Sequence, residues 1–503
     1  MTDTDVPART VPAESGPATD PMRRTTGLVL APSCFFLVLL VPFPELSVEA
    51  HRLAAIMALV IVLWITEALP LAVTSLLGPS LAIILQVAPA GVTFRPFAST
   101  TIFLFIGSFI LAHALFVHRV NERVAFGVLS LKIVGARPNR ILIAYGLLAA
   151  FLSAWMSNTA TAAMLVPIGL SLIQFMESEA NIPKKYGTAL MLMTTYCCSR
   201  GGMATPVGTP PNLIAVGMIS EQLDMRITFV QWMLFSVPIV LVLLAIVFVY
   251  LSWVGNAGVD EIPGTEKIIA ERKAALGPWR RGEINAVIAF GVTVVLWVGP
   301  GLLALVLGRE HPVTVSVLSS VPEAVAAMVG VVLLFLLPIS KTQRSTITWK
   351  QAAQIDWGTI LLFGGGLALG ALAAATGLAQ AVGEAITGLV PTSDVTALTF
   401  AAALFTVLLS ETMSNTAATN ISIPIVISIA MASGVDPIVP AVASALAASV
   451  ADALPVSTPP NAIVYASGRV SILEMARYGV LMDLIAVTLV PGLAVLIIPL
   501  FLG

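Results

Sequence analysis

Long apolar runs recur along the chain from about residue 27 to its last residue, and short polar stretches separate them. The runs are continuous rather than alternating, which is typical of membrane-spanning α-helices and not of a transmembrane barrel. We therefore expect an all-α polytopic membrane protein with about eleven transmembrane helices. Their predicted ranges are 27–43, 53–68, 71–89, 99–117, 186–219, 228–254, 283–306, 321–338, 357–382, 438–467 and 478–501.

Two further apolar stretches, 139–175 and 396–430, are each interrupted by the polar triplet Ser-Asn-Thr. The first contains SNTATAAMLVPI, beginning at Ser157, and the second contains SNTAATNISIPI, beginning at Ser414. A polar tip within an apolar stretch is expected where the chain enters and leaves the membrane on one side and the tip is buried in protein. The sequence thus predicts two re-entrant hairpins in addition to the helices.

The positions of lysine and arginine predict the orientation. With a cytoplasmic N-terminus and two re-entrant hairpins, most of the 25 lysines and arginines fall on cytoplasmic segments. Cytoplasmic loops of membrane proteins carry such an excess of positive charge. The exceptions are Arg52, Arg95, Arg226 and Arg309 outside and Arg200 within a span. We expect a multi-pass protein of the inner (plasma) membrane.

Polar segments predict the domain boundaries. Residues 1–26 are rich in Pro, Thr, Ala and Asp and are expected to form a disordered cytoplasmic tail. The main polar insertion, 255–282, is expected to be a cytoplasmic linker with a short amphipathic helix near 264–276. It separates a first transmembrane repeat, 27–254, whose hairpin faces the cytoplasm, from a second, 283–503, whose hairpin faces outward.

A second shared motif follows each triplet: VGTPPNLIAVG in the first half and VSTPPNAIVYASG in the second. Thr-Pro-Pro-Asn cannot continue a helix, because each proline lacks an N–H and pushes the preceding residue out of the α region. The stretch GGMATPVGTPPN, 201–212, therefore predicts unwound backbone in mid-membrane. Hairpin and broken helix occur twice with opposite predicted orientation. Such inverted repeats are typical of secondary transporters that bind their substrate near the midplane.

These motifs carry groups suited to a pair of ions. Carbonyl oxygens of unwound backbone can coordinate sodium. The hydroxyl and amide groups of Ser-Asn-Thr, beside exposed helix N-termini, suit an anion. Asparagine serves both, because its amide oxygen can bind a cation while its NH₂ group faces the anion. One element can thus bind both ions and couple their movement.

Composition argues against other classes of protein. The chain is 58% hydrophobic and 10% charged, whereas a soluble domain carries about 25% charged residues. A net charge of −2 gives no indication of a nucleic-acid partner. The sequence shows no P-loop, Cys/His metal cluster or nucleophile elbow, so ATP-driven transport and enzymatic catalysis have no residue support. Cys34, Cys197 and Cys198 are interpreted as small core residues. His113 and His118, at the end of a span, are expected to be interfacial histidines with satisfied hydrogen bonds.

With these motifs the chain resembles the divalent-anion:sodium symporter family, the sodium-coupled dicarboxylate, citrate and sulfate carriers. The resemblance covers about residues 50–500. It rests on both Ser-Asn-Thr triplets, both Thr-Pro-Pro-Asn motifs, WITEALPL from Trp64 and DWGTILLFGGGLALG from Asp356. It implies a small anionic substrate, co-transported sodium, and a homodimer in the lipid bilayer. Each protomer would have a scaffold domain and a transport domain that moves as an elevator.

The resemblance also implies site residues, position by position. A first sodium site would use Ser153, Ser157, Asn158 and Gly208. A second sodium site would use Ser410, Ser414, Asn415 and Ser457. The substrate would be bound by Ser157, Asn158, Thr159, Thr209, Ser414, Asn415, Thr416, Thr458 and Pro459.

Two charged residues depart from the family's pattern. Arg200 and Asp452 stand where the family usually has small, apolar or aromatic residues. An isolated charge at membrane depth needs a partner, so we expect the two to pair across the repeat interface. Alternatively, Arg200 contributes to anion binding or replaces a sodium ion, or one or both side chains reach water. Glu411, just before the second tip, is expected to have a structural hydrogen-bonding role or to tune the second sodium site.

The sequence therefore predicts a secondary active transporter that imports divalent anions with sodium by an elevator mechanism. C4-dicarboxylates such as succinate, fumarate and malate are the leading substrates. Sodium-independent dicarboxylate exchange, which a role for Arg200 in place of sodium would favour, remains open, as does sodium:sulfate or sodium:citrate symport. An ion channel is the other class considered, and saturable uptake with counterflow would identify a carrier rather than a channel. The number of sodium ions stays open.

Overall fold

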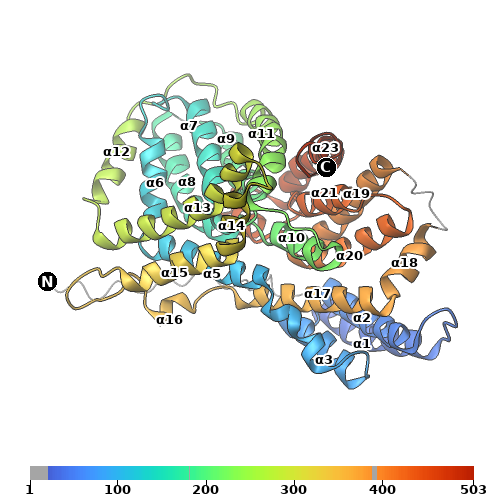
Figure 1. Cartoon of the computed structure of the whole chain (residues 1–503). Helices are drawn as coiled ribbons and strands as arrows, with labels where there is room; N and C mark the ends of the chain where they lie inside the picture. Colours follow the sequence, from blue (N-terminus) through green and yellow to red (C-terminus); the bar gives the residue numbers. More distant parts are fainter. Residues whose placement is uncertain (1–20, 181, 388–393, 503) are drawn as a thin grey trace.

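The computed structural model of the chain describes residues 21–180, 182–387 and 394–502. Over these ranges it consists of helices without a strand (Figure 1). Ten described helices are long and apolar enough to cross a membrane, or eleven if α14 (Pro312–Ser320) and α15 (Glu323–Leu336), bent by 56° at their junction, form one span. These ten include three helices of the two Ser-Asn-Thr hairpins, Asn158–Ala180, Val395–Thr412 and Asn415–Ala432. They do not include the helices interrupted at the two Thr-Pro-Pro-Asn motifs. The predicted all-α polytopic architecture is confirmed.

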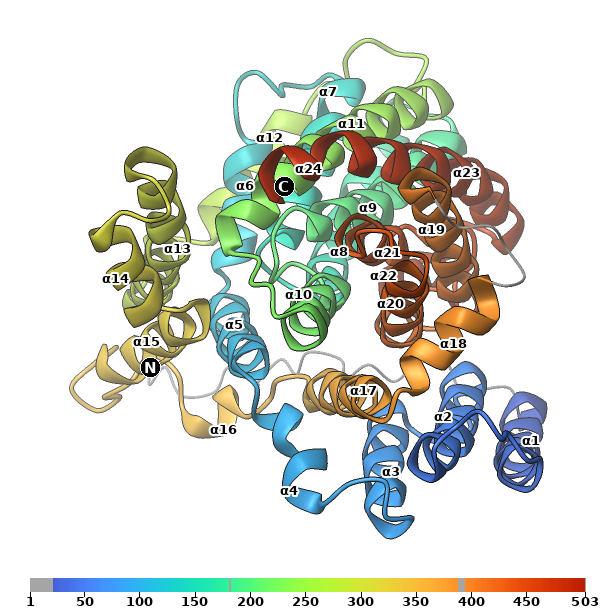
Figure 2. The same ribbon diagram turned by 45° about the vertical axis from the view of Figure 1, so that its right-hand side comes forward.

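The first helices pack beside α17 (Trp357–Thr376) around a small apolar core (Figure 2). They are α1 (Pro21–Leu40), α2 (Val48–Thr66) and α3 (Leu71–Ile84). Of the predicted tail, 1–26, residues 1–20 lie outside the described residues. Residues 21–26 were expected to be disordered, but they form the first part of helix α1. Proline is favoured in the first turn of a helix. The Arg23 guanidinium also donates to the carbonyl oxygens of Ile65 and Thr412, which gives this polar end of α1 partners in the fold.

The same order of elements occurs twice along the chain: a two-helix hairpin, a broken helix and a long helix. The first set is α7 (Pro138–Ser153), α8 (Asn158–Ala180), α9 (Lys184–Met203), α10 (Pro210–Leu223) and α11 (Phe229–Val254). The second set is α19 (Val395–Thr412), α20 (Asn415–Ala432), α21 (Ile438–Ala448), α22 (Pro459–Ala466) and α23 (Ile472–Ile497). Both hairpins break at the Ser-Asn-Thr triplet, and both broken helices resume at the first proline of Thr-Pro-Pro-Asn, as predicted.

Shorter elements and further helices lie before, between and after these two sets. They are α4 (Ala90–Thr93), the 3₁₀ turn η1 (Arg95–Ala98), α5 (Thr100–Val117), α6 (Val120–Leu129), α12 (Thr265–Ala275), α13 (Arg281–Leu307), α16 (Trp349–Ala352), α18 (Leu378–Thr387) and α24 (Pro499–Leu502). Helix α12 lies where the linker helix was predicted. Helix α14 was not predicted, because its nine residues are too few for a span.

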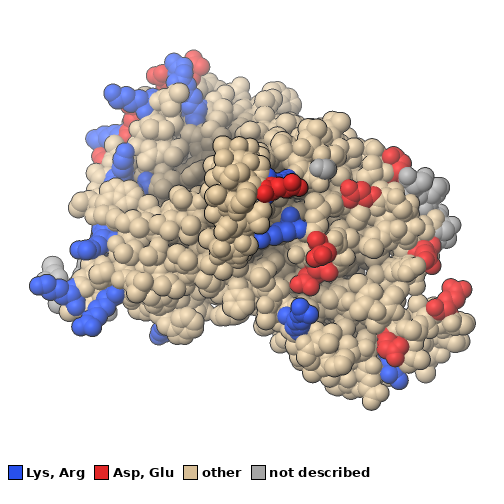
Figure 3. All heavy atoms as spheres, viewed as in Figure 1, with Lys and Arg blue, Asp and Glu red and all other residues tan. Residues whose placement is uncertain are grey.

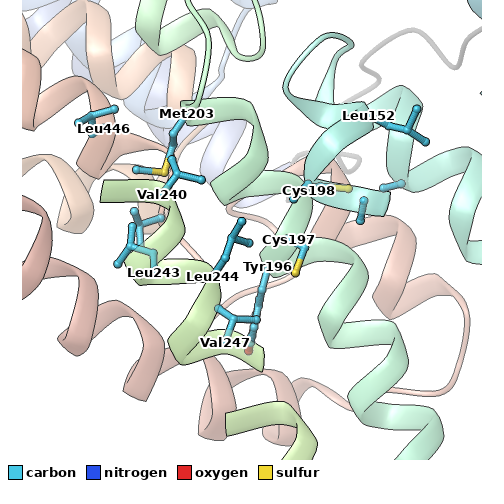
Figure 4. Packing of buried hydrophobic residues seen from close by; sticks show 14 of the residues in the cluster. Leu152, Tyr196, Cys197, Cys198, Met203, Val240, Leu243, Leu244, Val247 and Leu446 are labelled. Atoms are coloured by element: carbon cyan, nitrogen blue, oxygen red, sulfur yellow. The ribbon is translucent and has the colours of Figure 1, made fainter. Parts of the chain in front are cut away.

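The two sets share one large apolar core. Figure 4 shows side chains of α9, among them Cys197 and Met203, packed with valines and leucines of α11, and Leu446 of α21 belongs to the same cluster. Cys197 and Cys198 are completely buried there, which confirms their interpretation as core residues, whereas Cys34 is half-buried. Because both halves contribute to this core, the hairpins and broken helices are held together as one packed body.

Positive charge is concentrated at one side of the molecule. In Figure 3 lysine and arginine are most numerous on the left, over α12, α6 and α7 and the loop before α16, with some acidic residues among them, whereas acidic residues are most numerous on the right. The linker is fixed to this side by Arg123, which donates to the carbonyl oxygen of Gly277 at 3.0 Å and to Oε1 of Glu283 at 3.0 Å. This is the side that the distribution of lysine and arginine predicts to be cytoplasmic.

Candidate functional site

A cavity of about 700 Å³ lies where the two hairpin tips and the two broken helices meet. Its wall contains all nine residues that the resemblance assigns to the substrate: Ser157, Asn158, Thr159, Thr209, Ser414, Asn415, Thr416, Thr458 and Pro459. The two triplets are far apart in the sequence, and the fold brings them to one place. The structure thus supplies one cavity at which the hydroxyl and amide groups of both triplets come together with apolar side chains.

Capping side chains explain why helices begin at this cavity. Ser157 Oγ accepts the N–H of Ala160 at 3.2 Å, and Ser414 Oγ accepts the N–H of Ala417 at 3.3 Å. In the second broken helix, Thr458 caps α22 in the same way. Serine and threonine are favoured at this position because their oxygens satisfy free N–H groups of the first turn. Ser157, Ser414 and Thr458 therefore also define where a helix starts, whereas Thr209 precedes α10 without a side-chain cap.

Four helix N-termini meet at the cavity, those of α8, α10, α20 and α22. The positive ends of their dipoles favour a negatively charged ligand. Two of the four begin with consecutive prolines, which have no N–H to donate. Backbone N–H donors for an anion at these helix starts can therefore come from the two Ser-Asn-Thr tips, while the proline ends contribute dipole, the hydroxyls of Thr209 and Thr458, and apolar surface.

Beside the first tip, oxygen atoms converge in a manner suited to a hard cation. Ser153 Oγ donates to Oδ1 of Asn158 at 2.6 Å. A Cβ added to Gly208 would collide with the carbonyl oxygens of Gly202 and Ala154, so those oxygens approach closely only because residue 208 is glycine. Hydroxyl, amide and carbonyl oxygens are the ligands that such sites use for sodium. Three of the four residues implied for the first sodium site thus lie in this cluster.

The second tip has the same arrangement, again with a serine five residues before the asparagine that it contacts. Ser410 Oγ donates to Oδ1 of Asn415 at 2.6 Å and lies 2.7 Å from the carbonyl oxygen of Ala448. Ser457 Oγ instead donates to Oε2 of Glu411 at 2.7 Å. Glu411 Oε1 also accepts the N–H of Ala453 at 3.0 Å. Glu411 therefore has the structural hydrogen-bonding role expected of it, holding the unwound segment of the second broken helix.

Arg200 and Asp452 lie side by side within the core and away from the cavity. Arg200 Nη1 donates to Oδ1 of Asp452 at 2.7 Å, and Nη2 contacts Oδ2. The guanidinium also lies 5.4 Å from the ring centre of Tyr196, and the Asp452 N–H donates to Oδ1 of Asp483 at 3.0 Å. Neither Arg200 nor Asp452 is among the described residues that line the cavity. The alternative in which Arg200 binds the anion directly has no geometric support.

A second part of the cavity wall was not found from the sequence. It comes from α5 and from the start of α17, and comprises Phe109, Ala112, His113, Phe116, Gln354, Ile355, Asp356, Trp357 and Gly358. The DWGT motif that opens α17 contributed to the resemblance, but no binding role was assigned to it. Asp356 is engaged as the cap of α17, since its Oδ1 accepts the N–H of Thr359 at 3.1 Å.

The two histidines at the end of α5 differ from one another. His118 Nε2 lies 2.7 Å from the carbonyl oxygen of Thr346, as expected for a satisfied histidine. For His113 the expectation is wrong: both ring nitrogens are buried and have no hydrogen-bond partner among the residues that the structure describes. His113 belongs to the cavity wall, but its ring nitrogens are covered by packed neighbours that place no hydrogen-bonding group within reach.

Residues 22–502 match the family described as the sodium:sulfate symporter transmembrane region. Sodium-dependent dicarboxylate transporter SdcS of Staphylococcus saprophyticus is 34% identical over 500 residues, covering 95% of this chain and 92% of that protein. SdcS of Staphylococcus aureus, strain bovine RF122, is 34% identical over 487 residues, with the same two coverages. The resemblance seen in the motifs is therefore confirmed.

Two solved structures share the fold at low sequence identity. The YdaH transporter of Alcanivorax borkumensis has a TM-score of 0.56 and 16% identity, covering 96% of this chain and 98% of that one. MtrF of Neisseria gonorrhoeae, described as illuminating a class of antimetabolite efflux pumps, has a TM-score of 0.57 and 13% identity, covering 95% of each chain. At these identities the likeness concerns the fold alone.

Proposed function

This chain belongs to the sodium:sulfate symporter family, and on that basis we propose that it imports C4-dicarboxylates such as succinate, fumarate and malate together with sodium ions. It is a multi-pass membrane transporter and not an enzyme. The observation that carries the proposal is the single cavity at which both Ser-Asn-Thr tips and both Thr-Pro-Pro-Asn motifs meet. The relatives that are named sodium-dependent dicarboxylate transporters support the choice of ions.

Charge balance explains why sodium would be required. Of the residues that the structure describes, those lining the cavity include no lysine or arginine. A dianion placed there without a counter-charge would be very unfavourable in a low-dielectric site. Two sodium ions at the oxygen clusters would neutralise it. A third would leave the loaded carrier positive, and the membrane potential would then drive import at about 2.3 kcal/mol per charge per 100 mV.

The two asparagines are proposed to couple anion and cation. Asn158 and Asn415 each accept a hydrogen bond at Oδ1 from a serine of their oxygen cluster. Their NH₂ groups are donors only and suit a carboxylate. Sodium in the cluster would fix the amide in the orientation that presents its NH₂ group to the substrate. Occupancy of the cation site would thereby assemble the anion site.

The separation of the donor sets favours a dicarboxylate over sulfate or citrate. Each hairpin tip contributes its own serine, asparagine and threonine, so two groups of donors face the cavity from two different helix starts. A C4-dicarboxylate carries its two negative charges at opposite ends and can engage both tips at once. Sulfate has one compact centre of charge and cannot span the two tips in this way. It is the alternative substrate, because the matching family is described as sodium:sulfate symporters.

We also propose that the structure represents an inward-open state. Phe116 and Gln354 line both the cavity and a larger space of about 1070 Å³ bordered by α6, α8 and α12. That larger space is on the positively charged side, which we propose to be cytoplasmic. The site would then be open inward, and an elevator movement of the packed hairpins, in inverted repeats of a homodimer, would expose it outward.

Uptake of radiolabelled succinate into proteoliposomes tests this function. We expect uptake to be saturable and to require an inward sodium gradient, and excess unlabelled fumarate or malate to inhibit it more than sulfate or citrate. Equal uptake with potassium in place of sodium, together with acceleration by internal succinate, would instead identify a sodium-independent exchanger. Inhibition by sulfate but not by dicarboxylates would identify a sulfate carrier.

A further inference from the structure

His113 is a histidine without a hydrogen-bond partner in the wall of the substrate cavity. It is on α5, and its side chain is 5% exposed. Neither Nδ1 nor Nε2 has a partner among the described residues. The ring packs beside Phe116, with ring centres 6.5 Å apart and planes at 22°. Buried polar groups are nearly always hydrogen-bonded in proteins, so an unpaired one calls for a ligand or a second conformation.

The other three histidines provide the contrast. His51 Nε2 lies 2.7 Å from the carbonyl oxygen of Val38, and His118 Nε2 lies 2.7 Å from that of Thr346. His311 Nδ1 accepts the N–H of Val313 at 3.3 Å, capping α14. Each of these has a structural hydrogen bond to backbone. Within the described chain, the one histidine without such a bond is the one at the cavity.

The electrostatics of the cavity make this position unusual. The two tips present neutral hydroxyl and amide groups, and the described lining includes no lysine or arginine. Asp356, the lining carboxylate, is engaged with Thr359. Trp357, which also lines the cavity, already donates its ring N–H to the carbonyl oxygen of Ala353. Among the described lining residues, His113 therefore offers an uncommitted ring N–H, with or without positive charge, from outside the two hairpins.

The position of His113 along α5 places it on the route out of the cavity. Phe116, one turn further along the helix, lines both the cavity and the larger space on the positively charged side. A substrate that moves from the tips toward that space passes this part of α5. Both ring nitrogens are covered in the present arrangement, but the ring has no hydrogen bond to break in order to turn toward the cavity.

We propose that His113 is a substrate-contacting residue, whose ring N–H donates to a carboxylate of the bound dicarboxylate from the wall formed by α5. This inference rests on the proposed function and adds a contact from outside the hairpins. Each carboxylate would still meet one of the two tips, and one of the two carboxylates would gain an additional donor from α5. The contact would strengthen binding of substrates that have a second carboxylate and would not involve the sodium ligands.

The test compares His113→Phe, which keeps an aromatic ring and removes the donor, with His113→Gln, which keeps a neutral donor. His311→Phe, at an exposed cap far from the cavity, is the matched control. Initial rates of uptake into proteoliposomes give KM and maximal rate for the anion that the wild type transports, tested among succinate, fumarate, sulfate and citrate. The sodium concentration for half-maximal rate is measured in parallel.

For His113→Phe we expect KM to rise about tenfold or more, as for loss of one hydrogen bond to a charged group. His113→Gln should lie between this variant and the wild type, with the sodium requirement and the KM of His311→Phe unchanged. Wild-type KM in both His113 variants would overturn the inference. If His113→Phe does not fold, His113→Gln decides alone, since its KM either rises at unchanged sodium requirement or does not.

The same experiment separates this inference from the proposed function. A wild type that transports sulfate rather than succinate would refute the proposed substrate and leave the variants to be compared with sulfate. For sulfate, the inference predicts that the His113 variants have the wild-type KM, because a single compact anion held by the tips does not reach α5. A tenfold rise for sulfate would contradict the two-carboxylate arrangement on which the role of His113 depends.

Discussion

Arg200 on α9 and Asp452 in the break between α21 and α22 form a fully buried ion pair that joins the two halves of the chain. Asp452 is followed after five residues by Ser457, and Arg200 precedes Gly208 by eight. The pair therefore ties α9, which leads into the first unwound segment, to the unwound segment of the second broken helix, and the resemblance implies a sodium ion at each of these segments. Thr195, also on α9, adds a second link by donating to Oδ1 of Asn461.

Removing one member of this pair should destabilise the protein strongly. We expect Arg200→Met to lower the free energy of unfolding by about 3–5 kcal/mol, because it leaves Asp452 charged and unpaired in the core. The double variant Arg200→Met with Asp452→Leu should recover most of this loss. Thermal unfolding of the purified variants in detergent measures both, and a single variant as stable as the wild type would contradict a structural role for the pair.

The same double variant separates a structural role from a role in transport. Because Arg200 lies outside the cavity, we expect Arg200→Met with Asp452→Leu to retain the wild-type KM for substrate and the wild-type sodium dependence. Uptake at varied sodium concentration makes the comparison. If the double variant lost its sodium dependence or its substrate affinity, Arg200 would have to act as a counter-charge in the transport cycle.

The serines of the two oxygen clusters should govern sodium affinity. Ser153→Ala and Ser410→Ala each remove a hydroxyl oxygen beside the amide of the tip asparagine. We expect the sodium concentration for half-maximal uptake to rise roughly tenfold, corresponding to about 1.4 kcal/mol. Ser428→Ala is the control, since its hydroxyl donates within α20 to the carbonyl oxygen of Pro424. An unchanged sodium requirement in both cluster variants would exclude these sites.

Gly208 is a position where one methyl group should stop sodium-coupled transport. An added Cβ would enter the space between the carbonyl oxygens of Gly202 and Ala154, so the loop must shift and the oxygen cluster must open. We expect Gly208→Ala to reduce sodium-driven uptake at least tenfold while the protein still reaches the membrane. Gly291→Ala on α13, where an added Cβ has no neighbour within 4 Å, should transport normally. Equal activity of the two variants would argue against the cluster.

The parts of the site that were predictable are those where polar residues interrupt apolar sequence. A Ser-Asn-Thr triplet or a Thr-Pro-Pro-Asn motif within an apolar stretch does not fit a regular membrane-spanning helix, so it predicts a hairpin tip or a helix break. The pairing of Arg200 with Asp452 follows from the same reasoning, because each is a charge that needs a partner at that depth. The structure has hairpin turns and helix breaks at these motifs and pairs Arg200 with Asp452.

The wall formed by α5 and α17 could not be predicted in the same way. Phe109 and Phe116 are apolar residues in an apolar helix, and no local pattern distinguishes a cavity-facing side from a lipid-facing or packed side. His113 was expected to have a hydrogen-bond partner because most buried histidines do. The helical start of α1 at Pro21 was missed because its partners, the carbonyl oxygens of Ile65 and Thr412, are remote in sequence.

Labelling of single cysteines tests the proposed orientation. Glu271 on α12 and Glu310 between α13 and α14 are both exposed. In a background with Cys34→Ser, where the remaining Cys197 and Cys198 are buried, we expect Glu271→Cys to react only with reagent on the cytoplasmic side. Glu310→Cys should react only from outside. The reverse pattern would invert the assignment that rests on the distribution of positive charge.

Equilibrium binding of radiolabelled succinate to the purified protein tests the central claim most directly, that two hairpin tips hold one dianion together with sodium. In wild type we expect binding in sodium and little binding in potassium. Asn158→Ala and Asn415→Ala should each weaken binding in sodium at least tenfold, because each asparagine serves both ions. Succinate binding of equal strength in sodium and potassium, or full binding by either asparagine variant, would contradict the account.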